Sequence, residues 1–178
     1  MSNITLISEE FHDQLTLIRT PSISYSDLIR VVPKQLADKR ICYVTLNKTY
    51  DALINLFQMN DIPVDNTVFI DAITKSLNEV DNVDNCYFVS SPHALTELSI
   101  VINEFIQHSF EYLLFDSLTT LLIYHRKEEI VIKFLSSIIN VLKAFNCKGI
   151  FYVLNTDEHQ LLIDEATMLM DKTVDIGY

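Results

Sequence analysis

The sequence predicts a three-layer α/β domain with a mainly parallel central sheet. Apolar runs rich in β-branched and aromatic residues, typical of strands, alternate with segments whose apolar residues recur at helical spacing. The strand-like runs are mostly apolar and do not alternate strictly, as expected of parallel strands that are covered on both faces. Strands that alternate with helices in this way are joined by crossovers, which place helices on both sides of the sheet.

Seven runs have the composition of strands. Pro21 ends the first of them, because proline has no backbone N–H to give to a sheet. The sequence leaves open whether the fourth run is parallel or antiparallel to its neighbours. The runs are Gln14–Pro21, Arg40–Leu46, Thr67–Ile73, Asn85–Ser91, Glu111–Ser117, Lys148–Asn155 and Asp171–Gly177.

Five segments between these runs have helical patterns. Ser91 is expected to cap one helix, with Pro92 in its first turn, and Asn146 is expected to end another. Pro33 lies inside a third segment and is expected to kink or divide it. The segments are Tyr25–Lys39, Thr49–Asn60, Ser91–His108, Glu128–Asn146 and Asp157–Met170.

Composition indicates one domain over residues 1–178, because the sequence has no internal repeat, linker or low-complexity tract. A hydrophobic fraction of 49% is sufficient for a sizeable core. No apolar run approaches the roughly eighteen residues of a membrane span, and no secretory signal pattern opens the sequence. Cys42, Cys86 and Cys147 lie far apart in apolar stretches, which favours buried thiols over disulfides or a zinc site. These features predict a cytoplasmic protein.

The charge balance argues against nucleic acid as a partner. Thirteen Lys and Arg residues against 24 Asp and Glu residues give a net charge of −11. Nucleic-acid affinity comes largely from clustered Lys and Arg. The densest basic clusters in this sequence are only pairs, Lys39–Arg40 and Arg126–Lys127. Nucleic-acid binding is therefore not expected.

Polar residues follow the predicted strands at the edge where parallel α/β sheets bind ligands. Asp71 and Asp116 together offer oxygen ligands for magnesium, and each is also explained as a structural carboxylate. For Asp116, the structural interpretation is a set of hydrogen bonds from the amides of the following turn. Lys48 either binds an anion at the start of the next helix or lies in solvent. The strand-end residues are Thr20, Asn47, Asp71, Asp116 and Asn155.

Glycine is scarce where a phosphate-binding loop belongs. Such a loop turns its backbone amides inward around the phosphate, and side chains would block that approach. The only glycines are Gly149 and Gly177, which lie too late in the chain to follow the first strand. The segment Thr20–Leu28, which does follow it, has neither glycine nor lysine. The Walker A loop is therefore degenerate or absent in this sequence.

From about Thr16 onward, the chain resembles the RecA/KaiC-like ATPase core, especially its small stand-alone members without a recognisable P-loop. This resemblance implies a RecA-like fold, and it places Asp116 at the Walker B carboxylate that engages magnesium. It also places Asn47 and Lys48 where active members carry glutamates, one of them the catalytic base. The segments that carry the resemblance are Ile41–Leu53, Val68–Thr74, Val89–Phe105 and Leu113–Leu122.

Two functions fit these observations. The first is a non-catalytic KaiC-like pseudo-ATPase that regulates or scaffolds a protein partner, for which an active ATPase is one candidate. The alternative is a small-molecule or nucleotide-binding protein, or a weak Mg-dependent enzyme, that uses the strand-end crevice without a P-loop. A crevice filled by apolar side chains favours the first function, and an open pocket favours the second. The vestigial ligand site would comprise Thr20, Asn47, Lys48, Asp71, Asp116 and Ser117.

The first function carries expectations about ligands and assembly. No catalytic residue, bound metal or cofactor is expected, because the phosphate loop and the catalytic base are both missing from the pattern. The lost phosphate cradle and the charge of −11 argue against a nucleotide-dependent ring. The high apolar content favours a homodimer or a complex with another protein.

Overall fold

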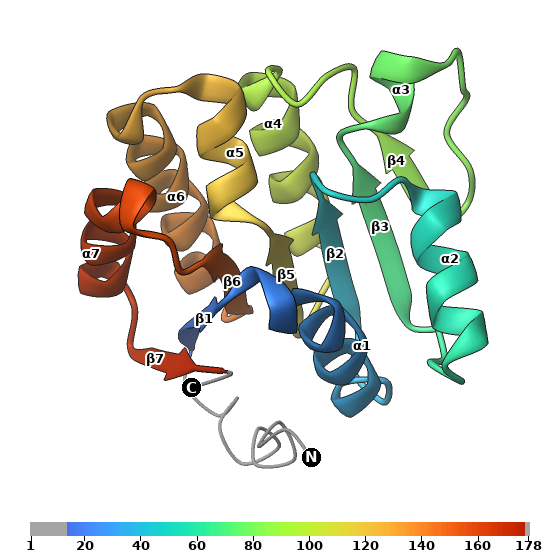
Figure 1. Ribbon diagram of the computed structural model, residues 1–178. Helices are drawn as coiled ribbons and strands as arrows, with labels where there is room; N and C mark the ends of the chain where they lie inside the picture. The colour runs from blue at the N-terminus through green and yellow to red at the C-terminus, as the bar shows by residue number, and fades with distance from the viewer. Residues whose placement is uncertain (1–13, 177–178) are drawn as a thin grey trace.

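The computed structural model of the protein describes residues 14–176, apart from the side chain of Asp157. At its centre lies a seven-stranded sheet in the order β4-β3-β2-β5-β6-β1-β7 (Figure 1). All strand pairs in this sheet are parallel, which confirms the predicted fold class and settles the direction of the fourth strand. The strands are β1 (Leu15–Thr20), β2 (Ile41–Thr45), β3 (Thr67–Asp71), β4 (Cys86–Phe88), β5 (Tyr112–Asp116), β6 (Lys148–Leu154) and β7 (Lys172–Asp175).

The carboxyl ends of β2, β3 and β5 lie level with one another. β5 is the middle strand, with β2 and β3 on one side of it, as the sequence predicted. Thr45, the last residue of β2, is the Cα partner of both Asp71 and Asp116. The two carboxylates therefore leave the sheet along the same edge. On the other side of the sheet, β1 lies between β6 and β7.

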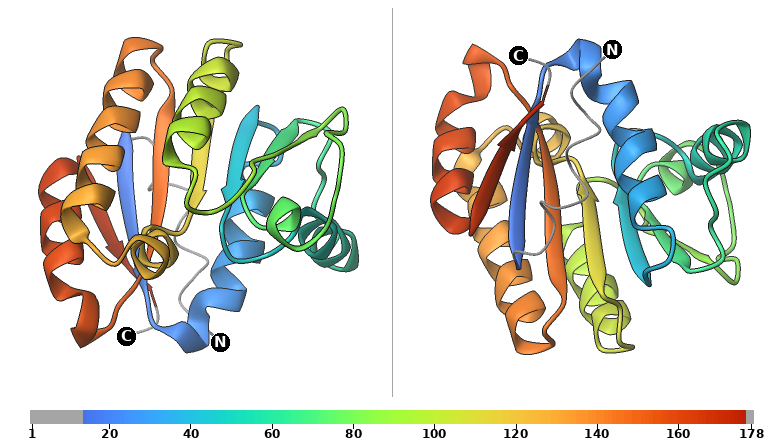
Figure 2. Two further views of the ribbon diagram at one scale, coloured as in Figure 1. Left: turned by 90° about the horizontal axis from the view of Figure 1, so that it is seen from above. Right: turned by 90° about the horizontal axis from the view of Figure 1, so that it is seen from below.

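Helices cover both faces of the sheet (Figure 2). Alternate strand residues supply two apolar layers, so that Tyr43 packs under α1 and α2 while Val44 packs under α4 to α7. The short helix α3 follows β3 directly. The helices are α1 (Tyr25–Gln35), α2 (Tyr50–Met59), α3 (Thr74–Leu77), α4 (Leu95–Ile106), α5 (Leu118–His125), α6 (Glu128–Ala144) and α7 (Gln160–Leu169), with two 3₁₀ turns at Ser22–Ser24 and Asp157–His159.

Some helix boundaries differ from the sequence prediction. Pro33 does not divide α1, because it lies in the last turn, where few backbone bonds remain to be lost. Ser91 does not cap α4: its Oγ accepts a hydrogen bond from the His93 N–H at 3.1 Å, and the helix begins at Leu95. Asn146 does follow α6, in the left-handed conformation with a φ of 52°.

The helix α5 was not predicted from the sequence. Its first five residues, 118–122, are all buried, so they show no polar face and no helical periodicity.

The predicted burial of the cysteines is confirmed, and all three are free thiols. Burial raises the pKa of Cys147 to about 12. Among residues 14–176, no helix combines the length and apolar character that crossing a membrane requires.

Candidate functional site

The candidate site is built around Asp116 at the end of β5. All five residues of β5 are buried, and Asp116 itself has no solvent exposure. Leu114, two residues earlier, packs in the layer beneath α1, so Asp116 faces the same layer. The peptide bond between Asp116 and Ser117 is cis. Ser117 then caps α5, where its Oγ accepts a hydrogen bond from the Thr120 N–H at 3.2 Å.

Three donors from separate parts of the chain contact the Asp116 carboxylate. The Tyr25 hydroxyl, from the first residue of α1, lies 2.7 Å from Oδ1 and 2.6 Å from Oδ2. The Tyr43 hydroxyl, from β2, donates to Oδ2 at 3.0 Å. The Asn47 Nδ2 donates to Oδ1 at 2.6 Å. The Tyr25 hydroxyl has one proton, which it shares between the two oxygens or gives to one of them. The three donors therefore supply three protons to a carboxylate with about four lone-pair positions, and both oxygens are hydrogen-bonded.

Burial dominates the electrostatics of this network. It raises the pKa of Asp116, while the hydrogen bonds from Tyr25, Asn47 and Tyr43 and the positive charge of Lys48 act in the opposite direction. Burial also raises the pKa of Tyr25 and of Tyr43, and the neighbouring Asp116 carboxylate adds to both shifts. Both tyrosines therefore keep their protons at neutral pH, as their role as hydrogen-bond donors requires.

Asn47 connects Asp116 to the start of α5. Its side-chain oxygen accepts a hydrogen bond from the Thr120 hydroxyl, which in turn lies 3.0 Å from the Ser117 Oγ. Asn47, Asp116 and Ser117 are therefore joined in one hydrogen-bond network. These are three of the six residues that the sequence analysis assigned to the ligand site. Lys48 interacts with this network through its charge on Asp116.

Asp71 belongs to a different network, although it lies at the same edge and is also fully buried. Its Oδ2 accepts hydrogen bonds from the Tyr50 N–H at 2.6 Å and the Thr74 hydroxyl at 2.5 Å. Its Oδ1 accepts from the N–H groups of Ile73 at 2.7 Å and Thr74 at 2.9 Å. Tyr50 and Thr74 are the first residues of α2 and α3. Asp71 thus holds the N-termini of two helices in place.

The segment after β1 closes on itself. Thr20 is fully buried, and its hydroxyl donates to the Pro21 carbonyl at 3.3 Å. The Ser24 N–H bonds to the Pro21 carbonyl, and the Tyr25 N–H bonds to the Ser22 carbonyl. Pro21 has no N–H. These backbone groups therefore serve the turn, and the side chain that this segment sends to the sheet edge is the Tyr25 phenol.

Sequence reasoning found Asp116 and Asn47 but missed Tyr25 and Tyr43. Tyr43 lies within a strand that is buried throughout, where an aromatic residue is read as core. Tyr25 was visible as the aromatic residue in the segment that replaces the phosphate loop. The expectation that the amides of the following turn would hold Asp116 is wrong, because its donors come from α1, β2 and the loop after β2. Asp71, by contrast, does accept hydrogen bonds from the backbone amides of the residues that follow it.

The seven-stranded parallel sheet with helices on both faces matches a RecA/KaiC-like fold. The chain is similar to the crystal structure of a KaiC-like protein from the hyperthermophilic archaeon Pyrococcus horikoshii. The TM-score is 0.65 at 11% sequence identity, over 91% of this chain and 71% of that one. At this identity, the similarity concerns the fold. No protein-family model matches the sequence, and neither does any curated protein.

The fold raises the question whether these residues fit magnesium and a nucleotide. They do not fit, because three side-chain donors already hold the two oxygens of Asp116 and the carboxylate is closed off from solvent. The donor that closes it, Tyr25, comes from the segment where a phosphate loop would lie. Within residues 14–176, no three His, Cys, Asp or Glu side chains are grouped so that they could hold a metal ion.

Proposed function

We propose that the protein is a non-catalytic KaiC-like pseudo-ATPase, one domain over residues 1–178, that regulates or scaffolds a protein partner. The observation that carries this proposal is the closure of Asp116 by Tyr25, Tyr43 and Asn47. A magnesium ion at Asp116 would have to displace these donors from a fully buried carboxylate. Such displacement leaves the donors without partners and is therefore costly.

The residues that follow β2 add to this argument. Hydrolysis needs a group that takes a proton from the attacking water. An amide such as that of Asn47 cannot do so, and this amide is already held between Asp116 and Thr120. The ammonium group of Lys48 is a proton donor. An active ATPase is one candidate partner for a protein of this kind, and the three buried free thiols favour the cytoplasm as its compartment.

A single observation favours the alternative, a small-molecule or nucleotide-binding protein. The Tyr152 hydroxyl is buried and has no hydrogen-bond partner among residues 14–176. Phe115 of β5 and Phe151 of β6 are Cα partners in the sheet, so Asp116 and Tyr152, which follow them, lie on adjacent strands at the same level. Buried hydroxyls are usually paired, and a water or a small polar ligand would satisfy this one. A single unpaired hydroxyl is weaker support than the closure of Asp116, so the pseudo-ATPase comes first.

Phosphate release from magnesium-ATP tests the proposal. We expect the wild-type protein to release phosphate no faster than buffer, and Asp116→Asn to leave that rate unchanged. Asp51→Asn, at an exposed position in α2, is the matched control. Turnover that Asp116→Asn abolishes and Asp51→Asn preserves would overturn the pseudo-ATPase in favour of an active enzyme.

Light scattering after size exclusion tests the mode of assembly. We propose a homodimer or a complex with another protein, because a net charge of −11 opposes large homo-oligomers. The measured mass should be the same with and without magnesium-ATP. A ring that forms only with nucleotide would contradict this proposal.

A further inference from the structure

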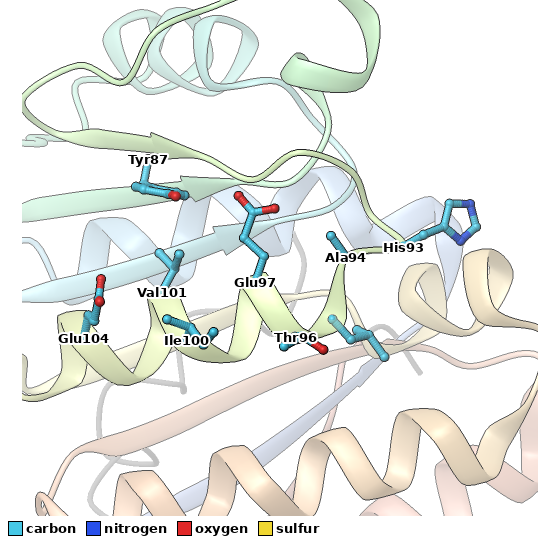
Figure 3. A pocket seen from close by; sticks show the side chains of 9 residues that line it. Tyr87, His93, Ala94, Thr96, Glu97, Ile100, Val101 and Glu104 are labelled. Carbon is cyan, nitrogen blue, oxygen red and sulfur yellow. The ribbon is translucent and has the colours of Figure 1, made fainter.

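A groove of about 600 Å³ lies between α4 and the edge strand β4, away from Asp116 (Figure 3). Ile100 and Val101 of α4 contribute apolar side chains, and Ile100 is 54% exposed. Tyr87 of β4 lies on the opposite side of the groove. Exposed isoleucine in a concave site beside a tyrosine ring is typical of a surface that buries apolar side chains of a partner.

Two carboxylates border this apolar surface. Glu97 and Glu104 both line the groove from α4, and both carboxylates point to the side on which Tyr87 lies (Figure 3). They are seven residues apart, which is two helical turns or about 10.5 Å. Among the described residues, no Lys or Arg lines the groove. Within residues 14–176, neither glutamate forms an ion pair. Glu97 does accept hydrogen bonds from the backbone and hydroxyl of Ser90.

The edge of the sheet beside the groove is unsuited to an added strand. Cys86 exchanges backbone hydrogen bonds with Val83 in both directions at 3.0 Å. The Phe88 N–H donates to the Asn82 Oδ1 at 2.9 Å. An extended peptide pairs through such backbone groups, and the chain already uses them. A helix, which satisfies its own backbone groups, does not need them.

Charge decides among the possible occupants. A second copy of this chain would bring another net charge of −11 to a groove bordered by glutamates. The residues that precede the described part of the chain include Glu9, Glu10 and Asp13, so they also carry negative charge. Like charges brought together oppose binding, whereas complementary charges favour it. The groove therefore calls for a basic partner.

We propose that the groove binds an amphipathic helix of another protein, with two Lys or Arg residues seven positions apart on one face and apolar residues between them. The basic side chains would pair with Glu97 and Glu104, and the apolar residues would bury the exposed side chain of Ile100. This spacing repeats every two turns on one face of a helix, so it matches that of the two glutamates. The inference rests on the proposed function, because it names the class of partner through which that function acts.

Fluorescence anisotropy with a designed probe tests the groove. The probe is a labelled peptide of Lys, Leu and Ala, about 18 residues or five turns long. Its lysines are seven positions apart on one face of the helix, and leucines lie between them on the same face. We expect Glu97→Gln/Glu104→Gln to weaken binding about five- to tenfold, because two exposed charge pairs are lost. The matched control is Glu128→Gln/Glu129→Gln at the start of α6, which removes the same charge elsewhere and should change binding less than about twofold.

A second pair of variants tests the apolar part. Ile100→Asn should weaken the probe about tenfold through lost apolar burial, whereas Met168→Asn, at an 85% exposed position on α7, should not. Equal weakening by groove and control variants, or equal binding of a scrambled peptide of the same composition, would overturn the proposed site. Phosphate release, measured on the same proteins, separates the two proposals. If the probe binds and the protein also turns over ATP, only the pseudo-ATPase proposal is overturned. If the probe does not bind and there is no turnover, only the groove proposal is overturned.

Discussion

Asp71 and Asp116 are both fully buried carboxylates at the ends of β3 and β5, the two parallel strands that flank β2, yet they are held in different ways. Asp71 receives three of its four hydrogen bonds from backbone N–H groups, two of them within three residues of its own position. Asp116 receives all of its contacts from side chains, and every donor lies at least 69 residues away in the sequence.

The difference separates a carboxylate that satisfies nearby backbone groups from one that is held by side chains of distant segments. The donors to Asp71 are orphan amides at helix N-termini, which any fold must satisfy. The donors to Asp116 are hydroxyl and amide side chains that converge on one buried carboxylate. Variants at the two carboxylates and at their donors should therefore differ in the size of their effects.

The largest effect is expected from Asp71→Ala. It removes the acceptor for three N–H groups and the Thr74 hydroxyl at a buried position, and unsatisfied buried donors are costly. We expect a loss of about 3–5 kcal/mol in the free energy of unfolding, measured by urea denaturation. Asp51→Ala, also near the start of α2 but exposed, is the control. A loss below about 1 kcal/mol would show that water replaces the carboxylate.

An intermediate effect is expected from Tyr43→Phe. The change removes a fully buried donor from Asp116, so the free energy of unfolding should fall by about 1.5–3 kcal/mol, as for hydrogen bonds to charged groups. Tyr25→Phe is the matched comparison. Because Tyr25 is only partly buried, water can replace its hydroxyl, and a loss of about 1 kcal/mol is expected. The reverse order in urea denaturation would mean that Tyr25 carries most of the closure.

The smallest effect is a pH dependence that follows from the raised pKa of Asp116. Between the ordinary Asp pKa of about 3.9 and the raised value, the folded state binds a proton that the unfolded state has lost. The stability that this proton contributes is complete below about pH 3.9 and is lost as pH rises through the folded pKa. Asp116→Asn removes this titration. The free energy of unfolding of the wild type minus that of Asp116→Asn should therefore fall as pH rises through this window. Urea denaturation over a pH series measures the difference, and a difference that rises with pH would contradict burial as the dominant cause.

Much of the fold follows from local sequence patterns. Each of the seven strands lies inside a run predicted from its apolar composition, because buried parallel strands such as β5 have no polar face to interrupt them. The same property hid α5, whose first five residues are all buried. Prolines misled in two places. Pro33 lies in the last turn of α1, where a helix tolerates it, and Pro92 lies in a turn before α4 instead of inside it.

The site was less predictable because its contacts are tertiary. Asp116 and Asn47 were placed together because both follow strands that end at one edge. The sequence near Asp116 does not predict its contacts with Tyr25 and Tyr43, which lie 91 and 73 residues from it. Their hydroxyls reach the carboxylate only once β2 and α1 have packed against β5. Local propensity carries no information about such a meeting of distant segments.

The position of β1 between β6 and β7 has a consequence for synthesis of the chain. β1 leaves the ribosome before any other described strand, but both of its neighbours are translated last. In the other half of the sheet, β4-β3-β2-β5, all four strands are translated before β6 and β7. Until β6 emerges, the apolar strand Leu15–Thr20 has no neighbouring strand and is open to chaperones or to other nascent chains. Slowed elongation through the segment before β6 should therefore favour aggregation over folding.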